Sequence, residues 1–419
     1  MNLKNIKNKK VTIFGLGLFG GGVGSAKFFA QKGAKVTVTD LKNKQELKEP
    51  IEKLKKYRVK FVLGKHREED FKNTDLVIKG PGISSNSPYL AIARGNKVLI
   101  ENDVSIFFKL CKVPIVGITG SKGKSTTATL LRDVLKVRFK NALLGGNIGG
   151  SMLDLLPFIK KDSIVVLELS SWQLEGLLFC KKSPHIAIIT NIFPEHLNRY
   201  KSFQEYVEAK KIIFRFQKKN DYLILNSKLK KYNFKTKSQV IYFTGDNKEA
   251  VRAVGDIYSL PKERVEKKIL NFPGIPGRVE FVREIAGIKF YNDTCATHPE
   301  ATIYSIKKLK KENPQKEIIL IVGGEDKNLD FDRFNEFIEK ELKKIVVLPG
   351  RASQKIKPNI LKFPVADMKE AVWQAKKIAK KGDIALLSPA AASFNLFKNE
   401  FDRGNVFKQE VKKIIENEK

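Results

Sequence analysis

Residues 116–126, which read VGITGSKGKST, constrain the fold of this chain more than any other stretch. They follow an apolar run from Val113 to Ile118, which predicts a buried parallel strand. Beyond them, apolar residues recur at helical spacing: Leu130, Leu131, Val134 and Leu135. A strand, a glycine loop and a helix in this order direct backbone N–H groups and the positive end of the helix toward one point. We therefore predict that a polyphosphate binds there.

The loop also carries side chains that phosphate chemistry uses. We expect Lys124 to reach the β- and γ-phosphates and Ser125 to bind a magnesium ion. The other loop residues predicted to hold the nucleotide are Gly120, Ser121, Lys122, Gly123 and Thr126. The spacing is G-x-x-G-x-x-G-K-S, because Ile118 occupies the position where the general phosphate loop has its first glycine. An ordinary glycine-rich turn with a chance lysine is the alternative interpretation.

Chain length and cysteine use limit the class of protein. A chain of 419 residues is long for one hydrophobic core, so two or three domains are expected. The three cysteines, Cys111, Cys180 and Cys295, are widely spaced and odd in number, which excludes a disulfide framework and a cysteine zinc site. This cysteine use suits a reducing cytoplasm. No apolar run approaches the length of a membrane span, so we predict a cytoplasmic protein without a transmembrane segment.

The formal net charge of +34 raises nucleic acid as a partner. The lysines, however, are scattered through nearly every expected helix, and the runs at 228–235 and 307–311 are interrupted by apolar positions. Solvated helix faces explain this pattern better than a binding groove does. No aromatic platform or recognised nucleic-acid motif accompanies the charge. We therefore predict no nucleic-acid partner, whereas an acidic small substrate is compatible with the charge.

The N-terminal segment predicts a second phosphate-binding turn. Residues 10–40 are expected to form a strand, a glycine-rich turn, a helix and a strand, with G-x-G-x-x-G at 15–20 and Asp40 twenty residues after Gly20. Such a turn places a diphosphate over a helix N-terminus and a ribose or base near the acidic residue, and several nucleotides satisfy it. A further strand leads into the loop at 79–83, where ligands of α/β sheets bind. We place the first domain at residues 1–98.

A central domain, residues 99–273, is expected around the phosphate loop. Two apolar strands end in polar residues: 164–167 before Glu168, and 186–189 before Thr190 and Asn191. Strand ends beside a phosphate loop are where magnesium carboxylates belong, so Glu168 is a candidate metal ligand. His196 follows the second strand closely and is either a ligand or a hydrogen-bonding residue of the loop.

The pattern restarts beyond a segment rich in proline and glycine. Residues 271–277 predict a linker. Strands at 318–322, 344–348 and 383–387 then alternate with helices at 369–380 and 406–415. We assign residues 274–419 to a C-terminal α/β domain. The fold class is therefore α/β with three domains, the first and last Rossmann-like and the central one a parallel sheet of the P-loop ATPase type.

Nine motifs, in order along nearly the whole chain, resemble those of the Mur ligase family, most closely its D-glutamate-adding members. They are GITGSKGKST (117–126), GGNIG (145–149), LELSSWQLE (167–175), NIFPEHLNRY (191–200), YVEAKKIIF (206–214), PGR (276–278), YNDTCAT (291–297), GGEDKNLDF (323–331) and SPAAASFNLFKNEFDRGNVF (388–407). The shifted glycine of the phosphate loop is shared with that family. The resemblance implies a ligase that forms carbon–nitrogen bonds in peptidoglycan-precursor synthesis. It implies that ATP phosphorylates a carboxylate of UDP-N-acetylmuramoyl-L-alanine and that D-glutamate attacks the acyl phosphate.

The resemblance also implies the magnesium site and its supporting residues. Lys124 and two Mg²⁺ ions neutralise the meeting anions. Ser125 and Glu168 match ligands of one ion, and His196 matches a ligand of the other. Lys210 matches a lysine that is carbamylated in most members and then supports the metals. Taken without the resemblance, Lys210 predicts an exposed helix charge.

The remaining roles that the resemblance implies concern the substrates. The loop with Gly15, Gly17, Leu18 and Phe19, together with Asp40, would hold the UDP group, and Asn147 would lie near the phosphates. Arg278 and Asp293 match residues that contact ATP. Lys327 and Ser393 match the pocket for the incoming amino acid. Cys295 replaces a lysine that is usual in this pocket, and Glu400 replaces a residue that is more often aromatic.

Three alternatives remain open from the sequence. The chain could be a ligase of this type that adds a different amino acid or acts on a different nucleotide-linked acid. It could instead be a non-catalytic P-loop protein that binds a nucleotide or nucleic acid. Cys295 as a nucleophile is a poorer interpretation, because only His298 is near it in the sequence as a base. A monomer that binds a UDP-linked substrate and a free amino acid is expected.

Overall fold

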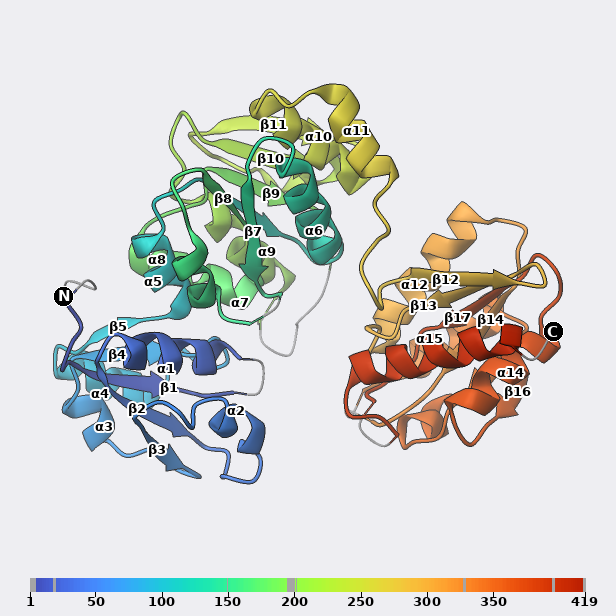
Figure 1. The fold of residues 1–419 in the computed structure, drawn as a ribbon, viewed down its shortest axis with the longest axis horizontal. Helices are drawn as coiled ribbons and strands as arrows, with labels where there is room; N and C mark the ends of the chain where they lie inside the picture. Colours follow the sequence, from blue (N-terminus) through green and yellow to red (C-terminus); the bar gives the residue numbers. More distant parts are fainter. Residues whose placement is uncertain are drawn as a thin grey trace. The chain divides into compact units, whose positions relative to one another are not determined.

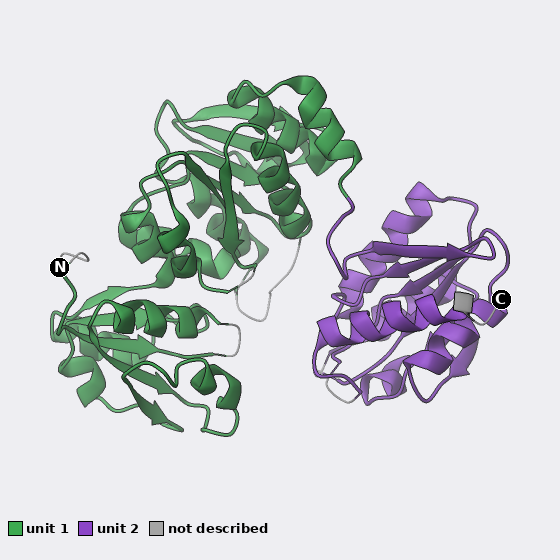
Figure 2. Ribbon diagram, in the orientation of Figure 1, with its two compact units in different colours: residues 1–272 green, residues 273–419 purple. Residues whose placement is uncertain are grey.

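The chain folds into two compact units, residues 1–272 and residues 273–419 (Figure 2). The structure is a computed structural model that describes residues 5–17, 20–148, 150–193, 200, 202–326, 329–393 and 396–416, with side chains through 414. Three parallel or mostly parallel sheets carry the fold, two in the first unit and one in the second (Figure 1). The predicted fold class, α/β with three sheet-centred domains, is confirmed.

The first sheet contains five parallel strands in the order β3-β2-β1-β4-β5. Its elements are β1 (Lys10–Phe14), α1 (Gly21–Gln31), β2 (Lys35–Asp40), α2 (Lys48–Glu52), β3 (Val59–Leu63), α3 (Glu69–Lys72), β4 (Leu76–Lys79), α4 (Pro88–Gly95) and β5 (Leu99–Glu101). The glycine-rich turn thus connects the central strand β1 to α1. Because β5 pairs with β4, residues 99–101 belong to this sheet, although the sequence assigns them to the central domain.

The second sheet contains six parallel strands in the order β11-β10-β9-β6-β8-β7. Its strands are β6 (Ile115–Thr119), β7 (Asn141–Gly146), β8 (Ser163–Glu168), β9 (Ile186–Ile189), β10 (Tyr222–Asn226) and β11 (Gln239–Phe243). The helices are α5 (Asp103–Leu110), α6 (Lys124–Leu135), α7 (Ser171–Leu174), α8 (Gly176–Cys180), α9 (Phe203–Lys211), α10 (Asn247–Ile257) and α11 (Lys262–Leu270), with 3₁₀ turns η1 (Met152–Phe158), η2 (Ile212–Phe214) and η3 (Ser227–Tyr232).

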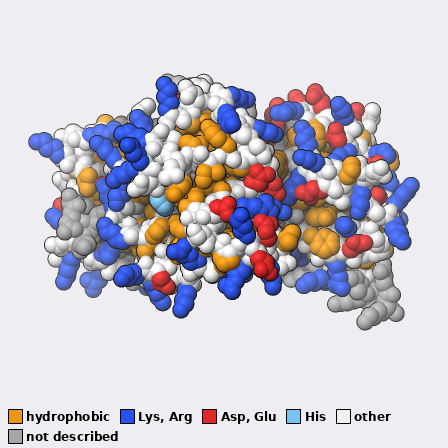
Figure 3. All heavy atoms as spheres, turned by 90° about the horizontal axis from the view of Figure 1, so that it is seen from above, with side chains coloured by type: hydrophobic (Ala, Val, Ile, Leu, Met, Phe, Trp, Pro, Cys, Tyr) orange, Lys and Arg blue, Asp and Glu red, His pale blue; other side chains and the backbone are white. Residues whose placement is uncertain are grey.

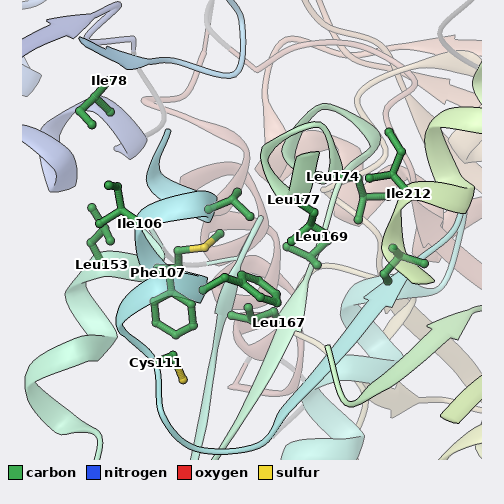
Figure 4. Packing of buried hydrophobic residues seen from close by; sticks show 14 of the residues in the cluster. Ile78, Ile106, Phe107, Cys111, Leu153, Leu167, Leu169, Leu174, Leu177 and Ile212 are labelled. Carbon is green, nitrogen blue, oxygen red and sulfur yellow. The ribbon is translucent and has the colours of Figure 1, made fainter. Parts of the chain in front are cut away.

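One hydrophobic core joins these two sheets, which explains why they form a single unit. Helix α5 follows β5 directly, and Ile106 and Phe107 on it are fully buried. Figure 4 shows both side chains in one cluster with Leu153 of η1 and Leu167 of β8. The cluster continues to Val11 and Ile78 of the first sheet. A second cluster packs α6, α10 and α11 on the other face of the central sheet.

The second unit is built on a six-stranded sheet in the order β12-β13-β17-β14-β15-β16. Its elements are β12 (Glu280–Ile285), β13 (Ile288–Asn292), α12 (Pro299–Glu312), β14 (Ile318–Val322), α13 (Asp332–Glu341), β15 (Lys344–Val347), η4 (Ala352–Lys355), β16 (Leu361–Pro364), α14 (Met368–Ile378), β17 (Ile384–Leu387) and α15 (Glu400–Glu416). Only β12, an edge strand paired with β13 through a tight hairpin, runs antiparallel. Two clusters of buried apolar side chains cover the two faces of this sheet.

On the face drawn in Figure 3, Lys and Arg side chains are scattered, with Asp and Glu side chains among them. None of the helices that the structure describes is long and apolar enough to cross a membrane.

Candidate active site

The phosphate-loop motif lies at the carboxyl edge of the second sheet. Strand β6 is flanked by β8 and β9, so the loop at 120–123 emerges between the ends of these two neighbours. Glu168 is the last residue of β8 and pairs with Ile118 of β6. Because all three strands are parallel, their polar end residues meet at one place, as the sequence predicts.

Two glycines of the loop have backbone conformations and close neighbours that disfavour any larger side chain. Gly120 has φ 148° and Gly123 has φ 83°, both in the region that favours glycine. A Cβ atom on Gly120 would lie 2.0 Å from the Thr190 Oγ1, and one on Gly123 would lie 2.3 Å from the Asn247 Nδ2. The turn therefore fits closely under its neighbours. Helix α6 begins directly behind it at Lys124, so the N–H groups of its first turn have no acceptor within the helix.

Asn191 holds the loop in place. Its carbonyl oxygen accepts a hydrogen bond from the Ser121 N–H at 2.9 Å, and its Oδ1 accepts one from the Lys122 N–H at 2.8 Å. Its Nδ2 donates to the Lys122 carbonyl at 2.9 Å, and the Thr190 hydroxyl donates to the same oxygen at 2.8 Å. The sequence flags Thr190 and Asn191 only as a polar strand end and does not predict this positioning role.

The side chain of Ser121 is part of the same support. It is buried, and its Oγ accepts a hydrogen bond from the Phe193 N–H at 3.0 Å and lies 3.2 Å from the Tyr206 hydroxyl. The Lys124 ammonium donates to the carbonyls of Gly120 and Ser121, each at 2.9 Å. Lys124 therefore lies directly against the phosphate loop, where it is predicted to contact the phosphates of a bound nucleotide.

Glu168 has one carboxylate oxygen without a partner among the described residues. The side chain is 2% exposed, and its Oε1 accepts from the Asn147 Nδ2 at 3.0 Å, whereas its buried Oε2 has no hydrogen-bond partner. The Asn147 N–H also donates to the Glu168 carbonyl at 2.8 Å. Burying a charged oxygen without a partner is costly, so this position is suited to a cation. No group of three His, Cys, Asp or Glu side chains at metal-binding distance occurs within the described ranges.

Lys210 is buried, contrary to the exposed helix charge that the sequence alone predicts. It lies on α9, is 2% exposed, and donates to the Gly120 carbonyl at 3.0 Å and the Thr119 Oγ1 at 3.2 Å. Its ammonium is 5.0 Å from the centre of the Tyr206 ring. The local sequence could not predict this burial, because the acceptors Thr119 and Gly120 lie 91 and 90 residues away in the chain. Lys124 and Lys210 thus share the Gly120 carbonyl as an acceptor.

At the first sheet, Asp40 binds the glycine-rich turn itself. Its Oδ2 accepts from the N–H groups of Leu16 at 2.8 Å and Gly17 at 3.1 Å, and its Oδ1 accepts from the Lys42 N–H at 2.9 Å. Gly15 and Gly17 both have positive φ. The carboxylate therefore orients the turn, and Leu18 and Phe19 of that turn lie outside the described residues.

A buried charge cluster that the sequence does not predict adjoins this turn. Lys79 ends β4, is 3% exposed and lies 4.0 Å from the Glu175 carboxylate. Asp103 begins α5 beside it, and burial raises the pKa of Asp103 to about 6 while the Lys79 charge opposes that rise. The loop at 79–83, which the sequence does single out, therefore brings a lysine between two acidic side chains.

In the second unit, Asp293 connects three segments. It is 4% exposed; its Oδ1 accepts from the Val279 N–H at 3.1 Å and its Oδ2 from the Ser388 hydroxyl at 2.7 Å. Burial raises the pKa of Asp293 to about 6, against the opposing effect of the hydrogen bonds from Ser305, Ser388 and Val279 and of the Arg278 charge. The nearby Cys295 is half-buried, and burial raises the pKa of its thiol, which disfavours a nucleophilic thiolate.

Arg403 clamps two loops of this unit. Its guanidinium, 1% exposed, donates to the Thr294 carbonyl at 2.8 Å, the Thr294 Oγ1 at 3.1 Å and the Ala391 carbonyl at 3.1 Å. Burial lowers its pKa to about 10. The clamp fixes the loop with Cys295 beside the loop with the buried Ser393. The sequence includes Arg403 in a motif without predicting this role.

The structure brings the predicted residues together in three groups. Lys124, Ser125, Glu168, Lys210 and Asn147 are at or next to the carboxyl edge of the second sheet. The Gly15 turn and Asp40 lie at the first sheet, and Arg278, Asp293, Cys295 and Ser393 belong to the second unit. The predicted residues His196 and Lys327 lie outside the described residues.

Comparison with known proteins matches all three parts of the chain. Residues 9–101 match the Mur ligase MurD-like N-terminal domain, residues 118–289 the Mur ligase middle domain, and residues 277–391 the glutamate ligase domain of Mur ligases. A protein named UDP-N-acetylmuramoylalanine--D-glutamate ligase from Borreliella burgdorferi (strain ZS7) is 39% identical, covering 99% of this chain and 100% of its own. One with the same name from Roseiflexus sp. (strain RS-1) is 36% identical, covering 97% and 99%.

Solved structures share the fold at lower identity. UDP-N-acetylmuramate-alanine ligase MurC from Thermotoga maritima has a TM-score of 0.58 at 19% identity and covers 97% of this chain and 99% of its own. The MurF ligase from Thermotoga maritima, in complex with ADP, has a TM-score of 0.59 at 15% identity and covers 99% and 100%. These likenesses extend across both units and support the fold alone.

Proposed function

The chain belongs to the Mur ligase family, and we propose on this basis that it is an ATP-dependent amide ligase that adds D-glutamate to UDP-N-acetylmuramoyl-L-alanine. The observation that carries the proposal is the 39% identity over the full length of a relative with that named activity. The reaction serves peptidoglycan-precursor synthesis. Because it consumes ATP, we place it in the cytoplasm, and we keep the expectation of a monomer.

The carboxyl edge of the second sheet suits the triphosphate of ATP. The first-turn N–H groups of α6 follow the glycine turn and have no acceptor within the helix, so they are suited to donate to phosphate oxygens. The Lys124 ammonium lies on the carbonyls of the same loop. We propose that this ammonium stabilises the negative charge that develops on the β- and γ-phosphates during transfer.

The proposed reaction balances in two steps. A carboxylate oxygen of UDP-N-acetylmuramoyl-L-alanine attacks the γ-phosphorus, the bond to the β-phosphate oxygen breaks, and ADP leaves. The amine of D-glutamate then attacks the acyl carbon, phosphate leaves with the bonding electron pair, and the amine loses a proton. Two anions approach in the first step, so the positive charge of Lys124 favours it.

Magnesium ions would neutralise phosphate charge at this edge when bound. We propose that Ser125 and Glu168 hold one ion and that His196 and Lys210 contribute to a second. The unpartnered Oε2 of Glu168 supports the first assignment. Carbamylation of Lys210 would leave one N–H on its Nζ and add two acceptor oxygens, so the modified side chain would keep at most one of its present hydrogen bonds to Thr119 and Gly120.

The other substrates are assigned to the first sheet and the second unit. We propose that the turn with Gly15, Gly17, Leu18 and Phe19 holds the UDP group and that Asp40 acts by orienting that turn. Asn147, which bonds Glu168, would lie near the phosphates. For the second unit, we propose that Arg278 and Asp293 contact ATP and that Lys327 and Ser393 bind the incoming amino acid.

Cys295 is the position at which this chain departs from the D-glutamate-adding pattern. We expect Cys295→Lys to lower the KM for D-glutamate by about three- to tenfold, because an ammonium would attract a carboxylate that a neutral thiol does not. Steady-state kinetics with varied D-glutamate measure the change. Cys295→Ser is the matched control and should leave both kcat and KM nearly unchanged. A loss of activity in Cys295→Ser would favour a nucleophilic thiol, and an unchanged KM in Cys295→Lys would contradict an altered pocket.

The proposed function is tested by following phosphate release from ATP. We expect release with UDP-N-acetylmuramoyl-L-alanine and D-glutamate together and little release when either is omitted. A panel of amino acids, including L-glutamate and D-aspartate, tests the second candidate, a ligase of the same type with another amino acid, for which the thiol at Cys295 is the supporting observation. Phosphate release that does not depend on either substrate would refute both candidate ligase activities.

A further inference from the structure

A basic groove lies on the second-sheet part of the first unit. It has a volume of about 910 Å³ and is lined by thirteen residues, of which one is acidic, Glu208. Six are cationic: Lys181, Lys211, Arg215, Lys218, Lys235 and Lys237. Lys and Arg make up 79 of the 419 residues of the chain, so the groove holds more than twice the share that composition predicts. We call these residues the basic groove.

Most of these cations have no acidic partner in the described part of the chain. The ammonium of Lys211 lies 2.8 Å from the Glu208 carboxylate, and the salt bridges of the described residues include none of the other five. Several like charges around one hollow repel one another, and an anion placed between them relieves that repulsion. The groove is therefore electrostatically complementary to a compact ligand with several negative charges.

One buried residue of the groove lining, Gln217, is held by hydrogen bonds to three neighbouring segments. Gln217, 4% exposed, donates from its Nε2 to the Pro184 carbonyl at 3.1 Å and the Tyr222 carbonyl at 2.8 Å. Its Oε1 accepts from the Ser238 hydroxyl at 2.9 Å. These bonds connect the segment after η2 to the segment after α8, to β10 and to the segment before β11, so the backbone next to Lys218 is held in place.

Size and lining favour phosphate groups over stacked bases. The volume lies within the range of small-molecule sites, roughly 300–1,000 Å³. The aromatic side chains in the lining are Phe214, which is buried, and Phe216, which is half-buried. Single-stranded nucleic acid is usually bound on exposed aromatic faces, which this lining does not offer. The ligand should be recognised through its charges.

Helix α9, which carries Lys210, also contributes to the lining of the basic groove. Lys211 and Glu208 of α9 line the groove, whereas Lys210 of the same helix donates to the Gly120 carbonyl of the phosphate loop. We propose that the basic groove is a second anion site, separate from the phosphate loop, that binds a short polyphosphate chain, either free or carried by a nucleotide. A ligand there contacts the helix that positions Lys210.

The test titrates sodium tripolyphosphate into the full-length protein in EDTA and follows the heat of binding. The Lys124→Ala background removes most binding at the phosphate loop. In that background, Lys218→Gln, Lys235→Gln and Lys237→Gln together should weaken binding about tenfold or more, since three of the six cations are neutralised. The matched control neutralises three exposed lysines of α11, Lys262→Gln, Lys267→Gln and Lys268→Gln, and should change the affinity less than threefold.

Each outcome decides the proposal. If the groove variant and the α11 variant lost the same amount of affinity for tripolyphosphate, the effect would come from net charge and the proposal would be overturned. The absence of measurable binding would overturn it as well. Similar affinities for ATP and tripolyphosphate would support a site that recognises the phosphate chain from either source. Tighter binding of ATP would support a site for a nucleotide. Tighter binding of a single-stranded oligodeoxythymidine, lost in the groove variant, would overturn it in favour of nucleic acid. Melting temperatures within 2 °C of the parent, roughly what an exposed substitution allows, establish that the variants fold.

Discussion

Lys124→Ala is expected to lower ATP-dependent phosphate release by about a thousandfold or more. Lys124 is the first residue of α6, and its ammonium already lies on the loop carbonyls of Gly120 and Ser121. Alanine removes the ammonium group that the motif places at the N-terminal end of α6. Charge that develops between the β- and γ-phosphates would then lack the stabilisation that this ammonium supplies. Phosphate release under saturating substrates measures the loss.

The control for this prediction is Lys136→Ala. Lys136 is exposed just beyond the C-terminal end of the same helix, so its removal changes the net charge equally without touching the loop. It should retain activity within about twofold, as surface substitutions usually do. If Lys124→Ala kept more than a tenth of the parent rate while remaining folded, the assignment of Lys124 to the transferring phosphates would be wrong.

Glu168→Gln carries the second largest expected effect. The change removes the negative charge but keeps the shape of a side chain that is 2% exposed. We expect activity to fall about a hundredfold or more, because the cation that the unpartnered Oε2 would bind loses its carboxylate. In EDTA, the variant should be as stable as the parent or more stable, since a buried charge has been removed. Mg²⁺ with ADP should raise the melting temperature of the parent but not of the variant.

Glu101→Gln is a matched control for that experiment. Glu101 is also 2% exposed and also has a buried Oε2 without a partner among the described residues, yet it ends β5 of the first sheet and pairs with Lys109. Its substitution should leave the Mg²⁺-dependent shift intact even if overall stability falls. A shift that disappears in both variants would indicate a general effect of buried charge and would contradict a specific metal site at Glu168.

The sequence predicts the scaffold of the site because short-range patterns determine it. The apolar runs before Gly120 and Glu168 form parallel strands, and the glycines mark a turn whose backbone conformation other residues rarely adopt. Strand periodicity and glycine conformation are local properties, so they are visible without the fold. Parallel strands bring their carboxyl ends to one edge of the sheet. The strand order that places Glu168 of β8 next to β6 and the phosphate loop is known only from the structure.

The contacts that hold the site were not predictable in the same way. Lys210 is buried with its ammonium on Thr119 and Gly120, which are distant in the sequence, whereas its neighbour Lys211 has the same local sequence environment but lines the basic groove. Asp40 satisfies the dinucleotide spacing, yet its carboxylate bonds the turn itself. Asn191 and Arg403 connect segments far apart in the chain. Each of these depends on which elements meet, and no local pattern encodes that.

The clamp formed by Arg403 has a consequence for the order in which the protein can mature during synthesis. Arg403 joins Thr294 and Ala391, yet it lies on α15, which is C-terminal to both. During translation the segment with Thr294 emerges more than a hundred residues before its clamp. The first unit can fold while the second is still being made, whereas the loops around Cys295 and Ser393 acquire their final geometry only after Arg403 has been added. Shortened chains that stop before α15 should therefore retain a folded first unit without a formed pocket in the second.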